Sequence, residues 1–124
     1  MPRIFIYEFT TGGGLLDGGD DMPLANLLAE GRAMVDALTA DFAMVDSVEV
    51  ACLVDRRSSK PIPAHVQATV VRDRDEATTA FDRLAARSDW TVVVAPEIDG
   101  HLLGCCRRVL DGGGRLLGPG PPVV

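Results

Sequence analysis

The chain has 124 residues, of which 47% are hydrophobic and 24% charged, a composition typical of one globular domain rather than of a disordered chain. Its formal net charge of −6 disfavours nucleic acid and anionic membranes as partners, because both bind basic patches. The three cysteines lack the spacing of a disulfide framework or zinc site, no export signal is visible, and no apolar stretch reaches the roughly 20 residues that span a bilayer. We therefore expect a cytoplasmic protein with no membrane partner.

The N-terminal part of the chain predicts a strand, a glycine-rich turn and a helix. Residues 3–9 are β-branched and aromatic, as in a buried strand, and they run into a turn at residues 10–14. Apolar residues then recur at helical spacing up to Phe42, and the helix can begin at Pro23 with Asp21 as its N-cap. The expected apolar stripe comprises Leu24, Leu27, Leu28, Gly31, Met34, Val35, Leu38 and Phe42, and the expected polar face comprises Glu30, Arg32 and Asp36.

Three further strands and a second helix are predicted in the middle of the chain. The strands are residues 48–54, 66–71 and 90–95. The helix lies between the last two of them, is capped by Asp73 or Asp75, and ends near Ser88. The last of these strands is apolar without interruption, which favours a central position in the sheet, covered on both faces.

The C-terminal part predicts a third helix, a short strand and a tail. Asp99 is the candidate N-cap of this helix and Gly112 its stop. Its expected inward residues are Leu102, Leu103, Cys106, Val109 and Leu110. Residues 115–118 form a short fifth strand, and the proline- and glycine-rich residues 119–124 are expected to be a linker, so that the domain comprises residues 1–118.

This order of elements predicts an α/β fold with an open, three-layer, mostly parallel sheet of about five strands and helices on both faces. Ligands of such sheets bind beyond the carboxyl ends of the strands. Three loops meet that description: residues 10–14, the loop after Val54, and residues 96–100.

The triple-glycine turn is the most informative local motif. It consists of Thr10, Thr11, Gly12, Gly13 and Gly14. Glycines allow positive φ and close backbone approach, and their N–H groups can face an anion. The sequence is neither a P-loop nor the dinucleotide-binding fingerprint, since the lysine of the first and the glycine spacing of the second are missing. A mobile turn and a ligand-contacting loop are equally compatible with it.

Carboxylates follow two of the predicted strands. Glu97 and Asp99 stand just past the fourth strand, where a carboxylate can hold a substrate amine or a metal. Capping of the next helix is the favoured interpretation of Asp99. Glu97 has no such structural role, and Glu8 at the end of the first strand is expected near the same crevice. A carboxylate pair does not define a reaction, so no catalytic residue and no metal ligand is assigned.

Other reactive side chains have simpler structural interpretations. Cys105 and Cys106 are adjacent on a predicted helix, which favours core packing over a disulfide. His65 and His101 lie in different loops with no partner at motif spacing, which favours surface positions. Trp90 is expected to pack at the sheet edge.

Five segments together carry a resemblance that spans nearly the whole chain. They are Arg3-Ile-Phe-Ile-Tyr-Glu-Phe-Thr-Thr-Gly-Gly-Gly14, Glu30-Gly-Arg-Ala-Met34, Asp89-Trp-Thr91, Ala95-Pro-Glu-Ile-Asp-Gly100 and Gly114-Arg-Leu-Leu-Gly118. In combination they resemble the N-terminal, pre-ATP-grasp domain of ATP-grasp ligases. The greatest likeness is to the group of tyramine-glutamate ligase of methanofuran biosynthesis and its bacterial relatives in one-carbon metabolism.

The resemblance implies a Rossmann-like domain that precedes the fold clamping ATP and magnesium. Such ligases activate a carboxylate as an acyl phosphate for attack by an amine. Because the sequence ends about where the ATP-grasp fold would begin, ATP and magnesium are expected in the full-length enzyme, and neither a cofactor nor activity is expected of this chain alone. By resemblance, residues 11–14 and 97–100 would face the catalytic domain or a small amine or amino-acid substrate.

Two other classes of function stay open from the sequence. One is a free-standing module that binds a small molecule or nucleotide, with the triple-glycine turn meeting a phosphate. The other is a structural or homodimerising domain, which would show a symmetric apolar patch. For the ligase domain, the expected partner is a C-terminal ATP-grasp domain in the same or a separate chain.

Overall fold

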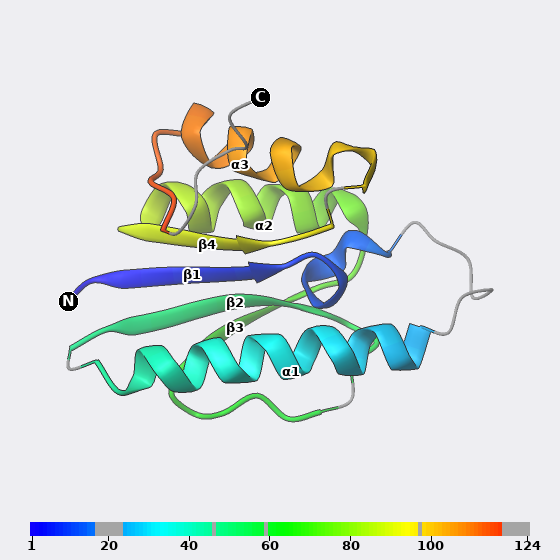
Figure 1. Cartoon of the computed structure of the whole chain (residues 1–124), viewed down its shortest axis with the longest axis horizontal. Helices are drawn as coiled ribbons and strands as arrows, with labels where there is room; N and C mark the ends of the chain where they lie inside the picture. The colour runs from blue at the N-terminus through cyan, green and yellow to red at the C-terminus, as the bar shows by residue number, and fades with distance from the viewer. Residues whose placement is uncertain (17–23, 46, 59, 97, 118–124) are drawn as a thin grey trace.

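The computed structural model describes residues 1–16, 24–45, 47–58, 60–96 and 98–117. Along the chain the elements are β1 (Arg3–Glu8), the short helical turn η1 (Thr10–Gly14), α1 (Leu24–Ala43), β2 (Glu49–Asp55), β3 (Val66–Val71), α2 (Arg74–Arg87), β4 (Trp90–Val94), η2 (Ile98–Gly100) and α3 (His101–Asp111) (Figure 1). The predicted start of α1 at Pro23, its cap Asp21, and the tail 119–124 lie outside the described residues. In the described part of the chain, no helix is both long and apolar enough to cross a membrane.

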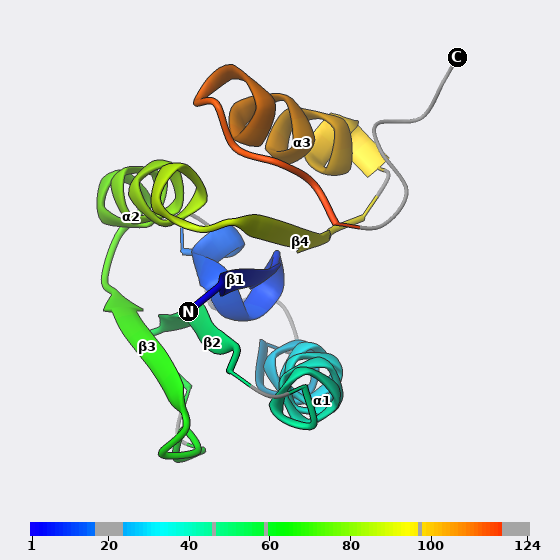
Figure 2. The ribbon, with the colours of Figure 1, turned by 90° about the vertical axis from the view of Figure 1, so that its left-hand side faces the viewer.

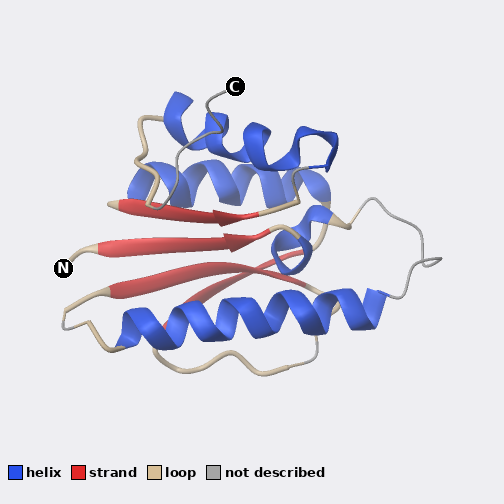
Figure 3. Ribbon diagram, viewed as in Figure 1, coloured by secondary structure: helices blue, strands red, loops and turns tan. Residues whose placement is uncertain are grey.

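The strands form one parallel sheet in the order β3-β2-β1-β4 (Figure 3). The predicted α/β fold is therefore confirmed. The predicted fifth strand is reduced to an isolated parallel bridge between Thr91 and Leu116, so the described sheet has four strands. The prediction that residues 90–95 lie centrally was wrong, because β4 is an edge strand whose outer side meets only that bridge.

Helices cover both faces of the sheet, as predicted. Figure 2 shows α1 on one face and α2 and α3 on the other. Side chains of a parallel strand alternate between the two faces, so β1 supplies both cores. Ile4 and Ile6 pack on the α1 side, and Phe5, Tyr7 and Phe9 pack on the side of α2 and α3.

Helix α1 differs from its predicted amphipathic pattern at two positions. Arg32 was expected on the polar face but is 5% exposed, whereas Met34 was expected in the apolar stripe but is 45% exposed. Arg32 is buried because its guanidinium contacts the loop after β2, which also covers this side of the helix. The periodicity of hydrophobic residues in the sequence does not indicate which charged side chain is buried.

The termini of α2 follow the sequence prediction, and the start of α3 does not. The Asp73 carboxylate accepts a hydrogen bond of 2.8 Å from the Glu76 N–H and caps α2. The predicted cap of α3 was wrong: its N-cap is Gly100, with φ of 72°, and Asp99 precedes it with φ of 58°. Two left-handed residues in succession turn the chain into α3, which moves the Asp99 side chain out of capping position.

The inward face of α3 is narrower than predicted. Cys106 and Val109 are buried, but Leu110 is 47% exposed. The helix lies beside α2 and over the edge strand β4, so only one narrow stripe of it meets the core.

Candidate functional site

The crevice predicted from the sequence falls at the topological switch point of the sheet, which the strand order places at the carboxyl ends of β1 and β4. The chain leaves β1 through α1 on one face and enters β4 from α2 on the other, so the direction of winding reverses between these two neighbouring strands. Parallel α/β sheets bind ligands at this point. The two loops meet here: the Phe9 N–H donates to the Val94 carbonyl at 2.8 Å, and the rings of Phe9 and His101 are in contact, with centroids 4.3 Å apart and planes tilted by 34°.

The turn after β1 is closed by the buried carboxylate of Glu8. Glu8 is 4% exposed and accepts hydrogen bonds of 2.9 Å from the backbone N–H groups of Thr10 and Thr11. The hydroxyls of both threonines also donate to it. Residues 10–14 therefore form a defined helical turn rather than an open loop, and the anion bound by its first two amides is the chain's own side chain.

Packing explains the three glycines of this turn. A Cβ at Gly12 would lie 2.5 Å from Cε1 of Tyr7, and a Cβ at Gly14 would overlap the Phe9 carbonyl. Gly13 has φ of 99°, a region that other residues avoid. Each glycine is thus required by the fold, and a role of residues 10–14 in substrate binding stays a prediction.

Gly31 brings α1 into direct contact with this turn. A Cβ at Gly31 would overlap both Oε1 of Glu8 and Oγ1 of Thr10, at separations that real Cβ atoms essentially never show. The absence of a side chain therefore lets the helix pass immediately beside the buried carboxylate. This contact gives a physical reason for a glycine in the middle of a helix, where its intrinsic propensity is poor.

The loop after β4 supplies the other side of the crevice. Asp99 is exposed at its tip, and Glu97 lies outside the described residues. Within the described chain, no side chain caps the N-terminus of α3, so the positive end of its dipole faces this loop. His101, predicted to lie at the surface, is half-buried against Phe9.

The loop after β2 is held against α1 by a network of hydrogen bonds and ion pairs that involves Arg32, Asp36 and Lys60. The Arg32 side chain donates from Nε to Oδ1 of Asp36 (2.8 Å) and from Nη1 and Nη2 to the carbonyls of Lys60 (3.0 Å) and Pro61 (2.5 Å). The Lys60 ammonium donates to the second oxygen of Asp36 at 2.5 Å. Sequence reasoning missed this network, because the carbonyls that bind Arg32 lie 28 and 29 residues away from it in the chain and the lysine that binds Asp36 lies 24 residues away.

Asp36 gives the network a testable pH dependence. Burial alone would raise the pKa of Asp36, but hydrogen bonds from Lys60 and Arg32 outweigh it and lower the pKa from its ordinary value of 3.8. The stability that the charged form contributes is therefore complete above that value and is lost as the pH falls through the lower folded pKa. We expect Asp36→Asn to reduce the free energy of unfolding at pH 7 by roughly 1 kcal/mol and to flatten its decline below about pH 4.

Urea unfolding at a series of pH values measures both effects. Asp41→Asn, at an exposed carboxylate of the same helix, is the matched control and should leave the pH profile close to that of the parent chain. An Asp36→Asn profile that parallels the parent profile through the acid range would show that the network contributes no charge-dependent stability.

The cysteines are packing residues, as predicted. Cys52 and Cys106 are buried, and Cys105 is half-buried and shares a hydrogen bond with Tyr7. Burial raises the pKa of Cys52 to about 11 and also raises the pKa of Cys105 and Cys106. All three are free cysteines, and burial favours the protonated thiol over the nucleophilic thiolate. Among the described residues, no three His, Cys, Asp or Glu side chains gather as metal ligands would.

The parallel sheet and its strand order define a Rossmann-like α/β domain, and comparison with known proteins identifies its family. Residues 48–124, more than half of the chain, match the pre ATP-grasp 3 domain. The chain belongs to the family of pre-ATP-grasp domains, which confirms that part of the resemblance seen in the sequence. No curated protein matches the sequence.

A solved structure shares the fold over almost the whole chain. It is a protein from Archaeoglobus fulgidus assigned to the ATP-grasp superfamily, which superposes with a TM-score of 0.69 and 19% sequence identity over 98% of this chain. The chain spans about a third of that protein's length, because the match covers 34% of it. The likeness extends the shared fold to residues that precede the family match.

Proposed function

We propose that the chain is the N-terminal substrate-binding and scaffold domain of an ATP-dependent carboxylate–amine ligase. The observation that supports the proposal is the topological switch point of the sheet, between β1 and β4, in a domain of the pre-ATP-grasp family. The two loops at this point are connected, since Glu8 accepts hydrogen bonds within one of them and the Phe9–His101 ring contact joins the other to it.

In this proposal, phosphoryl transfer takes place in an ATP-grasp region in the same or a separate chain. That region would bind ATP and magnesium and activate a carboxylate as an acyl phosphate. In the described turn of residues 10–14, the amides of Thr10 and Thr11 already bind Glu8 and do not meet a phosphate. The proposal therefore assigns no ATP chemistry to this turn.

The substrate proposed for this crevice is a small amine or amino acid. The residues proposed to bind its ammonium group are those predicted from the sequence, namely the turn of residues 10–14, Glu97 and Asp99. By resemblance the ligase belongs to the tyramine-glutamate ligase group, and thus to methanofuran biosynthesis or related one-carbon metabolism in the cytoplasm. Association into a homodimer is part of the same proposal.

Calorimetric titration of the purified chain tests this function. The titrants are ATP with magnesium, then glutamate, then tyramine. We expect no heat with ATP and weak, saturable binding of the amine or the amino acid. Clear ATP binding would overturn the ligase-domain proposal, as would silence toward both glutamate and tyramine when a supplied ATP-grasp partner also yields no amide.

The alternative function, a free-standing nucleotide-binding module, is less well supported than the ligase-domain proposal. It requires amides of the glycine turn to meet a phosphate, and two of them already bind Glu8. A purely dimerising domain would reveal itself in the same titrations as a chain that binds none of the three titrants and sediments as a dimer.

A further inference from the structure

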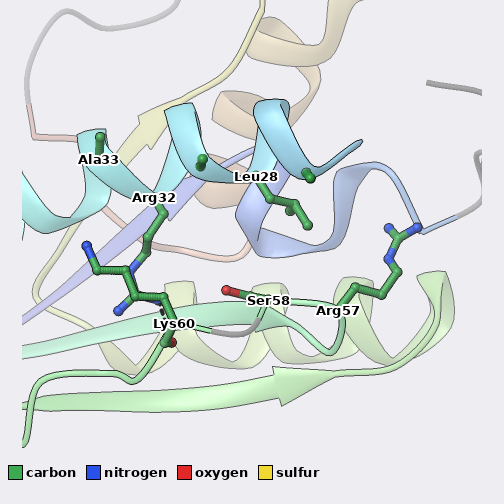
Figure 4. A pocket seen from close by; sticks show the side chains of 8 residues that line it. Leu28, Arg32, Ala33, Arg57, Ser58 and Lys60 are labelled. Carbon is green, nitrogen blue, oxygen red and sulfur yellow. Dashed lines mark hydrogen bonds between the residues drawn. The ribbon is translucent and has the colours of Figure 1, made fainter. Parts of the chain in front are cut away.

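A cavity separate from the crevice opens between α1 and the loop after β2. Its volume is about 290 Å³, close to the lower limit of roughly 300 Å³ for ligand pockets. The lining residues are Ala25, Leu28, Ala29, Arg32, Ala33, Arg57, Ser58 and Lys60 (Figure 4). The cavity thus has one wall of small apolar side chains from α1 and another of polar and basic side chains.

The basic wall carries more positive than negative charge. Arg32 and Lys60 share a single carboxylate, that of Asp36, so this group of three side chains has a net charge of +1. Arg57 at the other end of the cavity is paired with Asp55 through hydrogen bonds of 2.9 and 2.7 Å. A bound monoanion would balance the remaining charge, whereas a neutral ligand would leave it unopposed.

Counted against the described residues, hydrogen-bond donors of Arg32 and Lys60 remain available at the same place. A guanidinium carries five N–H donors and Arg32 uses three; an ammonium carries three and Lys60 uses one. Figure 4 shows Arg32 and Lys60 together at one end of the cavity, with the Ser58 hydroxyl between them and Arg57. Arg32 is 5% exposed and fixed by its three bonds, so it needs little ordering to hold a ligand.

We propose that this cavity binds a small monocarboxylate with an apolar body. The carboxylate accepts hydrogen bonds from Arg32, Lys60 and Ser58, and the apolar body lies against Leu28 and the alanines of α1. The cavity volume limits the ligand to a small molecule. This site lies beside β2 on the α1 face, away from the crevice of β1 and β4, and it does not rest on the proposed ligase function.

Titration followed by ¹H–¹⁵N NMR tests the site, with hexanoate as the probe. We expect saturable shifts of the Ser58 and Lys60 amides and the Arg32 Nε–H, with a Kd in the millimolar range. The neutral isostere hexanamide should bind at least tenfold more weakly. Inorganic phosphate should also bind at least tenfold more weakly than hexanoate, because it makes no contact with the apolar wall.

Two substitutions test the contributions of the basic wall and the apolar wall to binding separately. Lys60→Gln should weaken hexanoate binding at least fivefold, and Ala29→Leu should abolish it by filling the cavity. The matched controls are Arg107→Gln and Ala86→Leu, which make the same kinds of change at exposed positions on other helices and should leave the Kd unchanged. Preserved dispersion of the NMR spectrum establishes that each variant is folded.

The outcomes decide the proposal in either direction. Absence of saturable shifts with hexanoate, or equal binding of hexanoate and hexanamide, overturns it. Equal binding of phosphate and hexanoate that survives Ala29→Leu also overturns it, since the site would then be a bare cationic surface. Loss of affinity in both variants, with neither control affected, supports it.

Discussion

Replacing Gly31 with alanine is expected to destabilise the domain by roughly 3 kcal/mol and to lower its Tm by roughly 10 °C. The added methyl group would overlap the Glu8 carboxylate and the Thr10 hydroxyl, which are themselves fixed in a buried hydrogen-bond network. Either α1 must move away from β1 or the network must open, and both changes expose buried groups. Thermal and urea unfolding of the purified variant measure the loss.

Gly104→Ala is the matched control, because it is the same substitution inside another helix. A Cβ at Gly104 meets nothing within 4 Å, and the residue is exposed. Alanine is the better helix former, so this variant should be more stable than the parent chain by roughly 0.5 to 1 kcal/mol. Equal effects of the two variants would contradict the close approach of α1 to Glu8.

Removal of the Glu8 side chain is expected to cost roughly 3 to 5 kcal/mol. Glu8→Ala leaves the N–H groups of Thr10 and Thr11 without their acceptor in a buried place and creates a cavity beside Gly31. Glu8→Gln keeps the volume but turns one acceptor into a donor, so a loss of roughly 2 kcal/mol is expected. Urea unfolding, together with hydrogen exchange at the Thr10 and Thr11 amides, reports the change.

The control for this variant is Glu30→Ala, at an exposed carboxylate on α1, which should change stability by less than about 0.5 kcal/mol. A double variant adds a sharper test. Removal of the Glu8 side chain removes one of the two overlaps and releases the Thr10 hydroxyl from its bond to Glu8, so that this hydroxyl can rotate away from a methyl group at Gly31. The double variant should therefore be more stable than the two separate losses predict. Strict additivity would show that Gly31 is required for some other reason.

The elements of the fold could be predicted because their signals are local. The strand at residues 66–71 and a helix cap at Asp73 or Asp75 were predicted from neighbouring residues alone; the structure has the strand where it was expected, and Asp73 is the cap. The place of β4 at the sheet edge could not be predicted, because an apolar run has the same sequence in a central strand and in an edge strand covered by helices.

The residues of the candidate site stay a prediction, because the order of strands and helices indicates only at which end of the sheet a ligand binds. The partners of Arg32 and the left-handed turn at Asp99 and Gly100 could not be predicted, because tertiary contacts set them. One signal was available: a carboxylate followed by two threonines can bind its own backbone, which is the arrangement of Glu8 with Thr10 and Thr11.

Strand β1 is the first of the four described strands to be synthesised, but its second partner strand, β4, is the last to be synthesised. It pairs with β2 on one side and with β4 on the other, and residue 94 completes the second pairing. At translation rates of roughly 5 to 20 residues per second, the apolar strand keeps an open edge on the ribosome for on the order of 5 to 20 s. An open edge of this kind is a template for pairing with other chains. Exposure of β1 during synthesis is therefore set by the arrival of β4 and not by the stability of the finished domain.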